Sequence, residues 1–120
     1  MKKVILLEDD HLLIIVQSKM LQTLGYDVIE TSISGEEGLK KIQSLNPDFV
    51  VSDQNLSGRM KGLDVVEALR KENNEIPVLI LSGDTTYEHL KTASDINNVQ
   101  PLSKPVRVDD LKKTLQLLTN

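Results

Sequence analysis

The chain has 120 residues and no cysteine, which fits a single domain and excludes thiol chemistry and a disulfide framework. Eighteen acidic and 14 basic residues give a net charge of -4, the wrong sign for direct binding of nucleic acid through its phosphates. Two tyrosines and one phenylalanine are the only aromatic residues, so we expect a core of branched aliphatic side chains and no stacking on bases.

The N-terminal region predicts a strand followed by a helix. Residues 4–7 are a continuous apolar run, typical of a strand buried on both faces of a parallel sheet. Glu8 ends this run too early for a signal peptide or a membrane span, so we expect a cytoplasmic protein without membrane insertion. Asp10 can cap a helix that Gly25 ends. Its expected inward positions are Leu13, Val16, Met20 and Leu24.

The central region repeats this alternation. Residues 27–31 alternate like a strand, and Ser34 and Glu37 stand at capping-box spacing before a helix that Pro47 closes. The expected inward positions of that helix are Leu39, Ile42 and Leu45. Residues 49–52 predict a third strand, and a glycine-containing loop then leads to a helix with Leu63, Val66 and Leu69 on one face.

The C-terminal region adds two further strand and helix pairs. Residues 78–81 predict a strand, and residues 85–94 predict a more polar helix for which Asp84 is the expected cap. Residues 99–102 predict a short strand, which fits best at a sheet edge because Pro101 cannot donate a ladder hydrogen bond. The expected inward positions of the last helix are Val108, Leu111, Leu115 and Leu118. Five such repeats predict an α/β domain over residues 1–120, with a parallel sheet covered on both faces.

Residues capable of chemistry follow four of the predicted strands. Glu8 and Asp9 follow the first strand, Asp53 ends the third, Ser82 follows the fourth and Lys104 follows the fifth. Because parallel strands end at one edge of the sheet, these side chains are expected to meet there. Three carboxylates in one crevice repel each other unless a cation joins them.

The expected cation is Mg²⁺. Carboxylate oxygens of Asp9 and Asp53, a backbone carbonyl and waters suit its octahedral coordination at about 2.0–2.1 Å. Zinc is disfavoured because the chain lacks cysteine and neither His11 nor His89 ends a strand. A carboxylate beside Mg²⁺, a lysine and a hydroxyl can accept a phosphoryl group, which predicts an acyl phosphate on Asp53.

Four motifs in order resemble the receiver domains of two-component response regulators. They are Leu6-Leu7-Glu8-Asp9-Asp10, Val50-Val51-Ser52-Asp53, Leu81-Ser82-Gly83 and Leu102-Ser103-Lys104-Pro105. The resemblance covers residues 4–118. It implies a flavodoxin-like, doubly wound sheet of five parallel strands in the order 2-1-3-4-5, with five helices, which is the strand order of a chemotaxis regulator of the same family.

The resemblance also assigns roles to individual residues. It implies that Asp53 accepts phosphate from a histidine kinase or a histidine phosphotransfer protein and signals to a downstream output protein or fused domain. It implies that the ligands of Mg²⁺ are Glu8, Asp9, Asp53 and the backbone carbonyl of Asn55. Ser82 and Lys104 are expected to contact the phosphoryl group, and the bond between Lys104 and Pro105 is expected to be cis. Such a domain is not an enzyme beyond its own phosphorylation and dephosphorylation.

Three departures from the family pattern leave alternatives open. Pro101 stands where the family usually has an aromatic switch residue, Ser57 stands where proline is common, and the interval from Asp53 to Gly62 is one residue longer than in chemotaxis regulators. This loop resembles receivers of hybrid kinases, which leaves both an excised module and a single-domain relay protein open. The first rival function is a pseudo-receiver that binds partners without phosphorylation. A metal-dependent phosphatase is the second, although it needs a general acid soon after Asp53, where neutral amides follow.

Overall fold

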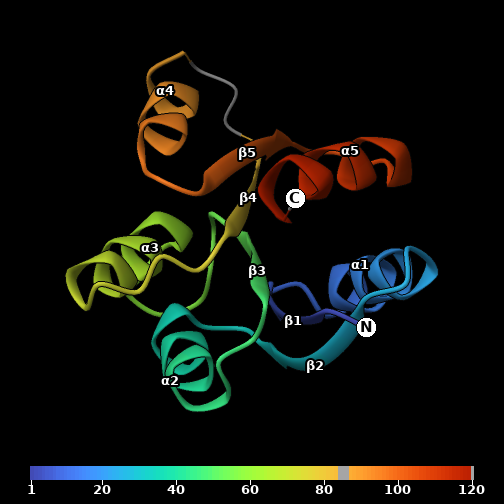
Figure 1. Ribbon diagram of the computed structural model, residues 1–120, viewed down its shortest axis with the longest axis horizontal. Helices are drawn as coiled ribbons and strands as arrows, with labels where there is room; N and C mark the ends of the chain where they lie inside the picture. The colour runs from blue at the N-terminus through green and yellow to red at the C-terminus, as the bar shows by residue number, and fades with distance from the viewer. Residues whose placement is uncertain (84–86, 120) are drawn as a thin grey trace.

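Strands and helices alternate along the computed structural model, which describes residues 1–83 and 87–119 (Figure 1). The strands are β1 (Lys3–Leu7), β2 (Asp27–Ser32), β3 (Phe49–Asp53), β4 (Val78–Ser82) and β5 (Val99–Ser103). The helices are α1 (His11–Thr23), α2 (Gly35–Leu45), α3 (Gly62–Lys71), α4 (Tyr87–Asp95) and α5 (Val108–Thr119). The predicted alternation of strand and helix is confirmed in this part of the chain.

The strands form one parallel sheet in the order β2-β1-β3-β4-β5. This is the doubly wound, flavodoxin-like order that the sequence motifs implied. Residues 4–7, 49–53 and 78–82 are buried throughout, which explains why these three strands are almost continuously apolar in sequence. The prediction for β5 is also confirmed: it lies at an edge of the sheet, where Pro101 is paired with Ile80 of β4.

Alternating side chains of the central strands supply two separate cores. Ile5 and Leu7 of β1 belong to the core beneath α2, α3 and α4, whereas Val4 and Leu6 belong to the core beneath α1 and α5. Figure 1 shows this division, with α1 and α5 on one side of the sheet and the other three helices on the opposite side. The sheet is therefore covered on both faces, and only its ends are free to form a site.

The prediction of which side chains of α1 point inward is wrong for Val16, and it omits the two residues of the helix that are buried. Val16 is 41% exposed, whereas the buried residues of the helix are Gln17 and Leu21. The reason is that α1 carries apolar residues around most of its circumference; Leu12 and Ile15, for example, are 68% and 67% exposed. Apolar spacing alone cannot locate the buried face of such a helix.

Two predicted inward positions at helix ends are also exposed. Leu45 is the last residue of α2 and Val108 is the first residue of α5, and both lie on the surface because a terminal turn has fewer neighbouring elements over it. The caps of the first two helices are confirmed, since Asp10 and Ser34 accept hydrogen bonds from backbone N–H groups of α1 and α2. The predicted cap Asp84 lies outside the described residues.

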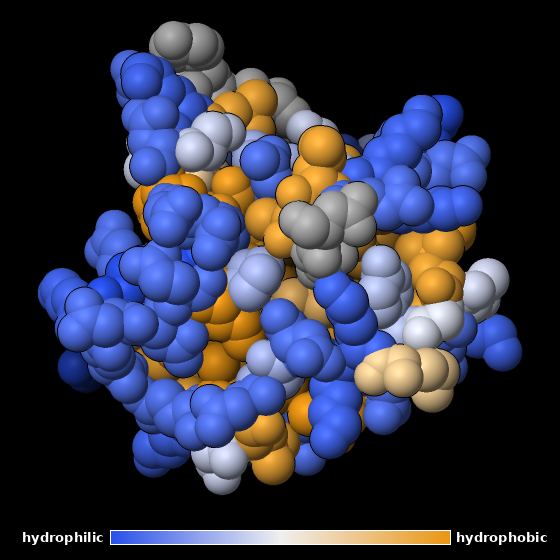
Figure 2. Space-filling model, viewed as in Figure 1, coloured by the Kyte–Doolittle hydropathy of each residue, from blue (hydrophilic) through white to orange (hydrophobic). Residues whose placement is uncertain are grey.

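Hydrophilic residues cover the outer sides of the helices on the face shown in Figure 2, and apolar residues are visible mainly between them. Among the helices of the described residues, none combines the length and apolar character that crossing a membrane requires.

Candidate functional site

The ends of β1, β3 and β5 bring three acidic side chains and one lysine together. Carboxylate oxygens of Glu8, Asp9 and Asp53 all lie within 4.8 Å of one another. The Nζ atom of Lys104 lies 2.8 Å from Asp53 Oδ2 and 3.3 Å from Glu8 Oε1. Lys104 and Asp53 are 51 positions apart in sequence, so the fold creates this contact. The predicted convergence at one edge of the sheet is therefore present for the three acids and the lysine.

The cluster is buried on one side and open on the other. Glu8 and Asp53 are buried, whereas Asp9 is exposed and the side chain of Lys104 is only 24% exposed. Among the described residues, this is the one place where three potential metal-binding side chains of the Asp, Glu, His and Cys types meet. Asp9 is therefore the member of the cluster that faces solvent.

The backbone and the carboxylate of Glu8 both make hydrogen bonds with neighbouring residues. Its backbone N–H donates to Ser32 O at the end of the pairing between β1 and β2. Its Oε2 atom accepts from the backbone N–H of Asp10, and its Oε1 atom accepts from Gln17 Nε2 at 3.1 Å and from Lys104. The carboxylate therefore has a fixed orientation before any ligand binds.

The acidic cluster has more negative than positive formal charge. Burial, followed by the negative charge of Asp53, raises the pKa of the Glu8 carboxyl group above its ordinary value. Burial alone would lower the pKa of the Lys104 ammonium, but its hydrogen bond to Asp53 and the charges of Asp53 and Glu8 raise that pKa overall. Three ionised carboxylates and one ammonium carry a formal charge of -2, which one divalent cation would neutralise.

The loop after β3 is anchored at several points. Asn55 N–H donates to Asp53 Oδ1 at 3.3 Å, while the side chain of Gln54 accepts from Leu63 N–H at the start of α3. Gly62 packs so closely that a Cβ atom there would lie 2.6 Å from Asp53 O. These contacts hold the backbone that follows Asp53 close to the end of the strand.

The ends of β4 and β5 contribute Ser82 and Lys104 to the same edge of the sheet. Ser82 is buried, and it follows Leu81, which is paired with Asp53 in the sheet. The backbone N–H of Lys104 donates to Ser82 O at 2.9 Å, so the two loops are joined directly. The bond between Lys104 and Pro105 is cis, as the sequence motif implied.

One member of the site was missed from the sequence. Gln17 is buried on α1 and donates to Glu8, but no role was predicted for it. A signal was available, because Gln17 falls in the stripe Ile14, Gln17, Leu21 and Leu24 at spacings of three and four residues. A polar residue in an apolar stripe that follows a cluster of acids is a candidate for contact with those acids.

Comparison with known proteins identifies the fold and the family. A family model described as the response regulator receiver domain matches residues 4–116. The chain belongs to this family. Phosphorylation and magnesium binding are typical of receiver domains, which function in two-component systems.

The relatives of this receiver domain include full-length regulators. It is 28% identical over 115 residues to the probable C4-dicarboxylate response regulator DctR of Bacillus subtilis, covering 95% of this chain and 50% of that protein. It is 31% identical over 113 residues to the nitrate/nitrite response regulator NarL of Escherichia coli, covering 92% and 52%. The chain thus spans about half the length of these two regulators, and still less of some other curated relatives.

A solved structure gives the same result. The chemotaxis protein CheY4 of Vibrio cholerae is 32% identical to this receiver domain, with a TM-score of 0.86 and 98% coverage of both chains. The similarity therefore extends over the whole fold, including the edge of the sheet at which the acidic cluster lies.

Proposed function

We propose that this receiver domain accepts a phosphoryl group on Asp53 in a two-component phosphorelay. The expected donor is a phosphohistidine on a histidine kinase or a histidine phosphotransfer protein. The observation that supports this proposal most strongly is the 2.8 Å contact between Lys104 Nζ and Asp53 Oδ2 beside two further carboxylates. A carboxylate at a strand end, paired with a lysine and next to the exposed Asp9, is suited to nucleophilic attack on phosphorus.

The acidic cluster fits Mg²⁺. Glu8, Asp9 and Asp53 offer only oxygen donors, which hard divalent cations prefer, and we propose the backbone carbonyl of Asn55 as a further ligand. Mg²⁺ bound there would supply positive charge that neutralises the oxygens of the transferring group. The fit is supported by the raised pKa of Glu8, which results from burial and then from the negative charge of Asp53, since both make a nearby cation favourable.

The residues of the chain have separate tasks in the proposed transfer. A carboxylate oxygen of Asp53 forms a bond to phosphorus while the bond from phosphorus to the imidazole nitrogen of the donor breaks, and the imidazole leaves with the electron pair. Lys104 is already at hydrogen-bonding distance from the attacking carboxylate, and its raised pKa keeps it cationic. The hydroxyl group of Ser82, at the end of the adjacent strand, is proposed to donate a hydrogen bond to a phosphoryl oxygen.

Phosphorylation is proposed to act as a switch rather than as turnover of a separate substrate. The new charge would draw Lys104 and Ser82 towards Asp53 and so shift the loops after β4 and β5. The face formed by α4, β5 and α5 would then change its affinity for an output protein or a fused domain. We propose a single receiver domain over residues 1–120, located in the cytoplasm as is consistent with the family, without direct nucleic-acid binding or membrane insertion.

The alternative function, a pseudo-receiver that binds partners without phosphorylation, is considered because of Pro101. This residue lies in β5 at the position where the family usually has an aromatic switch residue. The phosphatase alternative has less support. Gln54, directly after Asp53, accepts a hydrogen bond from Leu63 N–H through its side-chain oxygen and has no acidic proton to give.

The test is incubation with acetyl phosphate followed by the intact mass of the protein. We expect the mass of one phosphoryl group to be gained with Mg²⁺ and not with a chelator, because the carboxylates need a cation before an anionic donor can approach. A parallel calorimetric titration measures Mg²⁺ binding. Absence of both mass gain and Mg²⁺ binding would contradict the proposal and favour the pseudo-receiver. Sustained release of inorganic phosphate from an aryl phosphate would favour the phosphatase.

A further inference from the structure

Gln17 of α1 is a buried polar side chain with an incomplete set of partners. It is 4% exposed, and its Nε2 atom donates to Glu8 Oε1 at 3.1 Å. Its Oε1 atom is buried without a hydrogen-bond partner among the described residues. The orientation of the amide is fixed by chemistry, because a carboxylate only accepts hydrogen bonds and the NH₂ group must therefore face Glu8.

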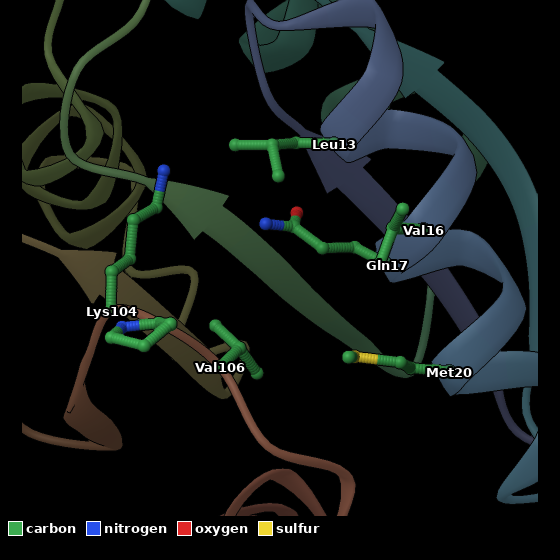
Figure 3. Close-up of a pocket in the computed structure, with 7 residues that line it drawn as sticks. Leu13, Val16, Gln17, Met20, Lys104 and Val106 are labelled. Atoms are coloured by element: carbon green, nitrogen blue, oxygen red, sulfur yellow. The ribbon is translucent and has the colours of Figure 1, made fainter.

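Packing does not account for an amide at this position. Gln17 lines a groove of about 500 Å³ between α1 and the segment after β5, together with apolar side chains such as Leu13, Met20 and Val106. Figure 3 shows its amide extending from α1 towards the side of the groove where Lys104 lies. An apolar side chain of the same length would suit this lining and would leave no buried oxygen unpaired. The contribution of the amide therefore lies in its contact with Glu8.

We propose that Gln17 is a positioning residue that holds Glu8 in place as a cation ligand. This inference rests on the proposed function. In the structure, Glu8 Oε1 accepts hydrogen bonds from both Gln17 Nε2 and Lys104 Nζ. When Lys104 turns towards a phosphoryl group on Asp53, Glu8 loses that donor, but the Gln17 donor stays because it comes from a helix rather than from a loop. Gln17 thus allows Lys104 to move without releasing the carboxylate.

The test replaces Gln17 by methionine, which has similar length and no donor. We expect Mg²⁺ affinity, measured by calorimetry on the unphosphorylated protein, to fall about tenfold, as is typical when a partner of a metal ligand is removed. Without Mg²⁺, the urea midpoint should change little, because the lost hydrogen bond to Glu8 and the removal of the unpaired oxygen have opposite effects on stability. At saturating Mg²⁺, the rate of phosphoryl gain from acetyl phosphate should return to that of wild type.

Met20→Leu is the matched control. Met20 lies on the same helix and lines the same groove, but it is not one of the residues that donate a hydrogen bond to Glu8. It should bind Mg²⁺ like wild type. Wild-type affinity in Gln17→Met, or in Gln17→Leu if the first variant does not fold, would overturn the positioning role while leaving the proposed function intact. Absence of Mg²⁺ binding in the wild-type protein itself would overturn both.

Discussion

Asp53→Asn is expected to gain no phosphoryl group from acetyl phosphate at any Mg²⁺ concentration. The amide has nearly the same shape as the carboxylate, so the fold and the contacts of the loop after β3 should persist. Its oxygen is a far weaker nucleophile and carries no charge to bind a cation, so both attack and cation binding are impaired. The time course of intact mass measures the effect, and we expect complete loss within detection.

Asp48→Asn is the matched control for this substitution. Asp48 is exposed and directly precedes β3, and its side chain accepts a hydrogen bond from Lys3 N–H, which an asparagine can also do. This variant should be phosphorylated at the wild-type rate. Phosphoryl gain that persists in Asp53→Asn would mean that another residue is the acceptor.

Lys104→Met is expected to separate cation binding from phosphoryl transfer. Transfer should slow on the order of 100-fold, because the phosphoryl oxygens lose a positioned donor. Mg²⁺ affinity should be kept or increased, since Lys104 Nζ and Mg²⁺ compete for the carboxylates of Glu8 and Asp53. Intact mass measures the first effect and calorimetry the second.

The same substitution should also lower stability in the absence of Mg²⁺. Glu8 and Asp53 are buried, and each loses a hydrogen-bonded cationic partner, which costs about 1–3 kcal/mol in free energy of unfolding. Added Mg²⁺ should therefore raise the urea midpoint of the variant more than that of wild type. Lys112→Met, on the exposed side of α5, is the control and should leave all three quantities unchanged. Wild-type transfer in Lys104→Met would remove Lys104 from the proposed mechanism.

The sequence predicts the strands of this fold well because three of them are buried on both faces. Apolar runs at residues 4–7, 49–52 and 78–81 coincide with β1, β3 and β4 to within a residue. The contact between Lys104 and Asp53 could also be anticipated, since parallel strands end at a common edge. The order of the strands, by contrast, came from resemblance to a family, because the spacing of apolar residues does not determine which strands are neighbours.

The helices and loops were harder to predict for identifiable reasons. The apolar residues of α1 surround the helix, so their spacing favoured Val16 and passed over Gln17. Contacts between side chains and loop backbone, such as Glu36 Oε1 with Met60 N–H at 2.7 Å, depend on a loop conformation that no local pattern specifies. Gln17 was therefore missed as a hydrogen-bond donor to Glu8 because the apolar residues of α1 do not mark its buried face.

Chemical mapping of the phosphorylated residue tests the central claim most directly. Borohydride reduces an acyl phosphate of aspartate to homoserine, which tandem mass spectrometry locates after digestion. With Mg²⁺ and acetyl phosphate, we expect homoserine at position 53, and none when a chelator replaces Mg²⁺. Homoserine at another aspartate, or an equal yield at position 53 with the chelator, would contradict phosphoryl acceptance by Asp53 at a magnesium site.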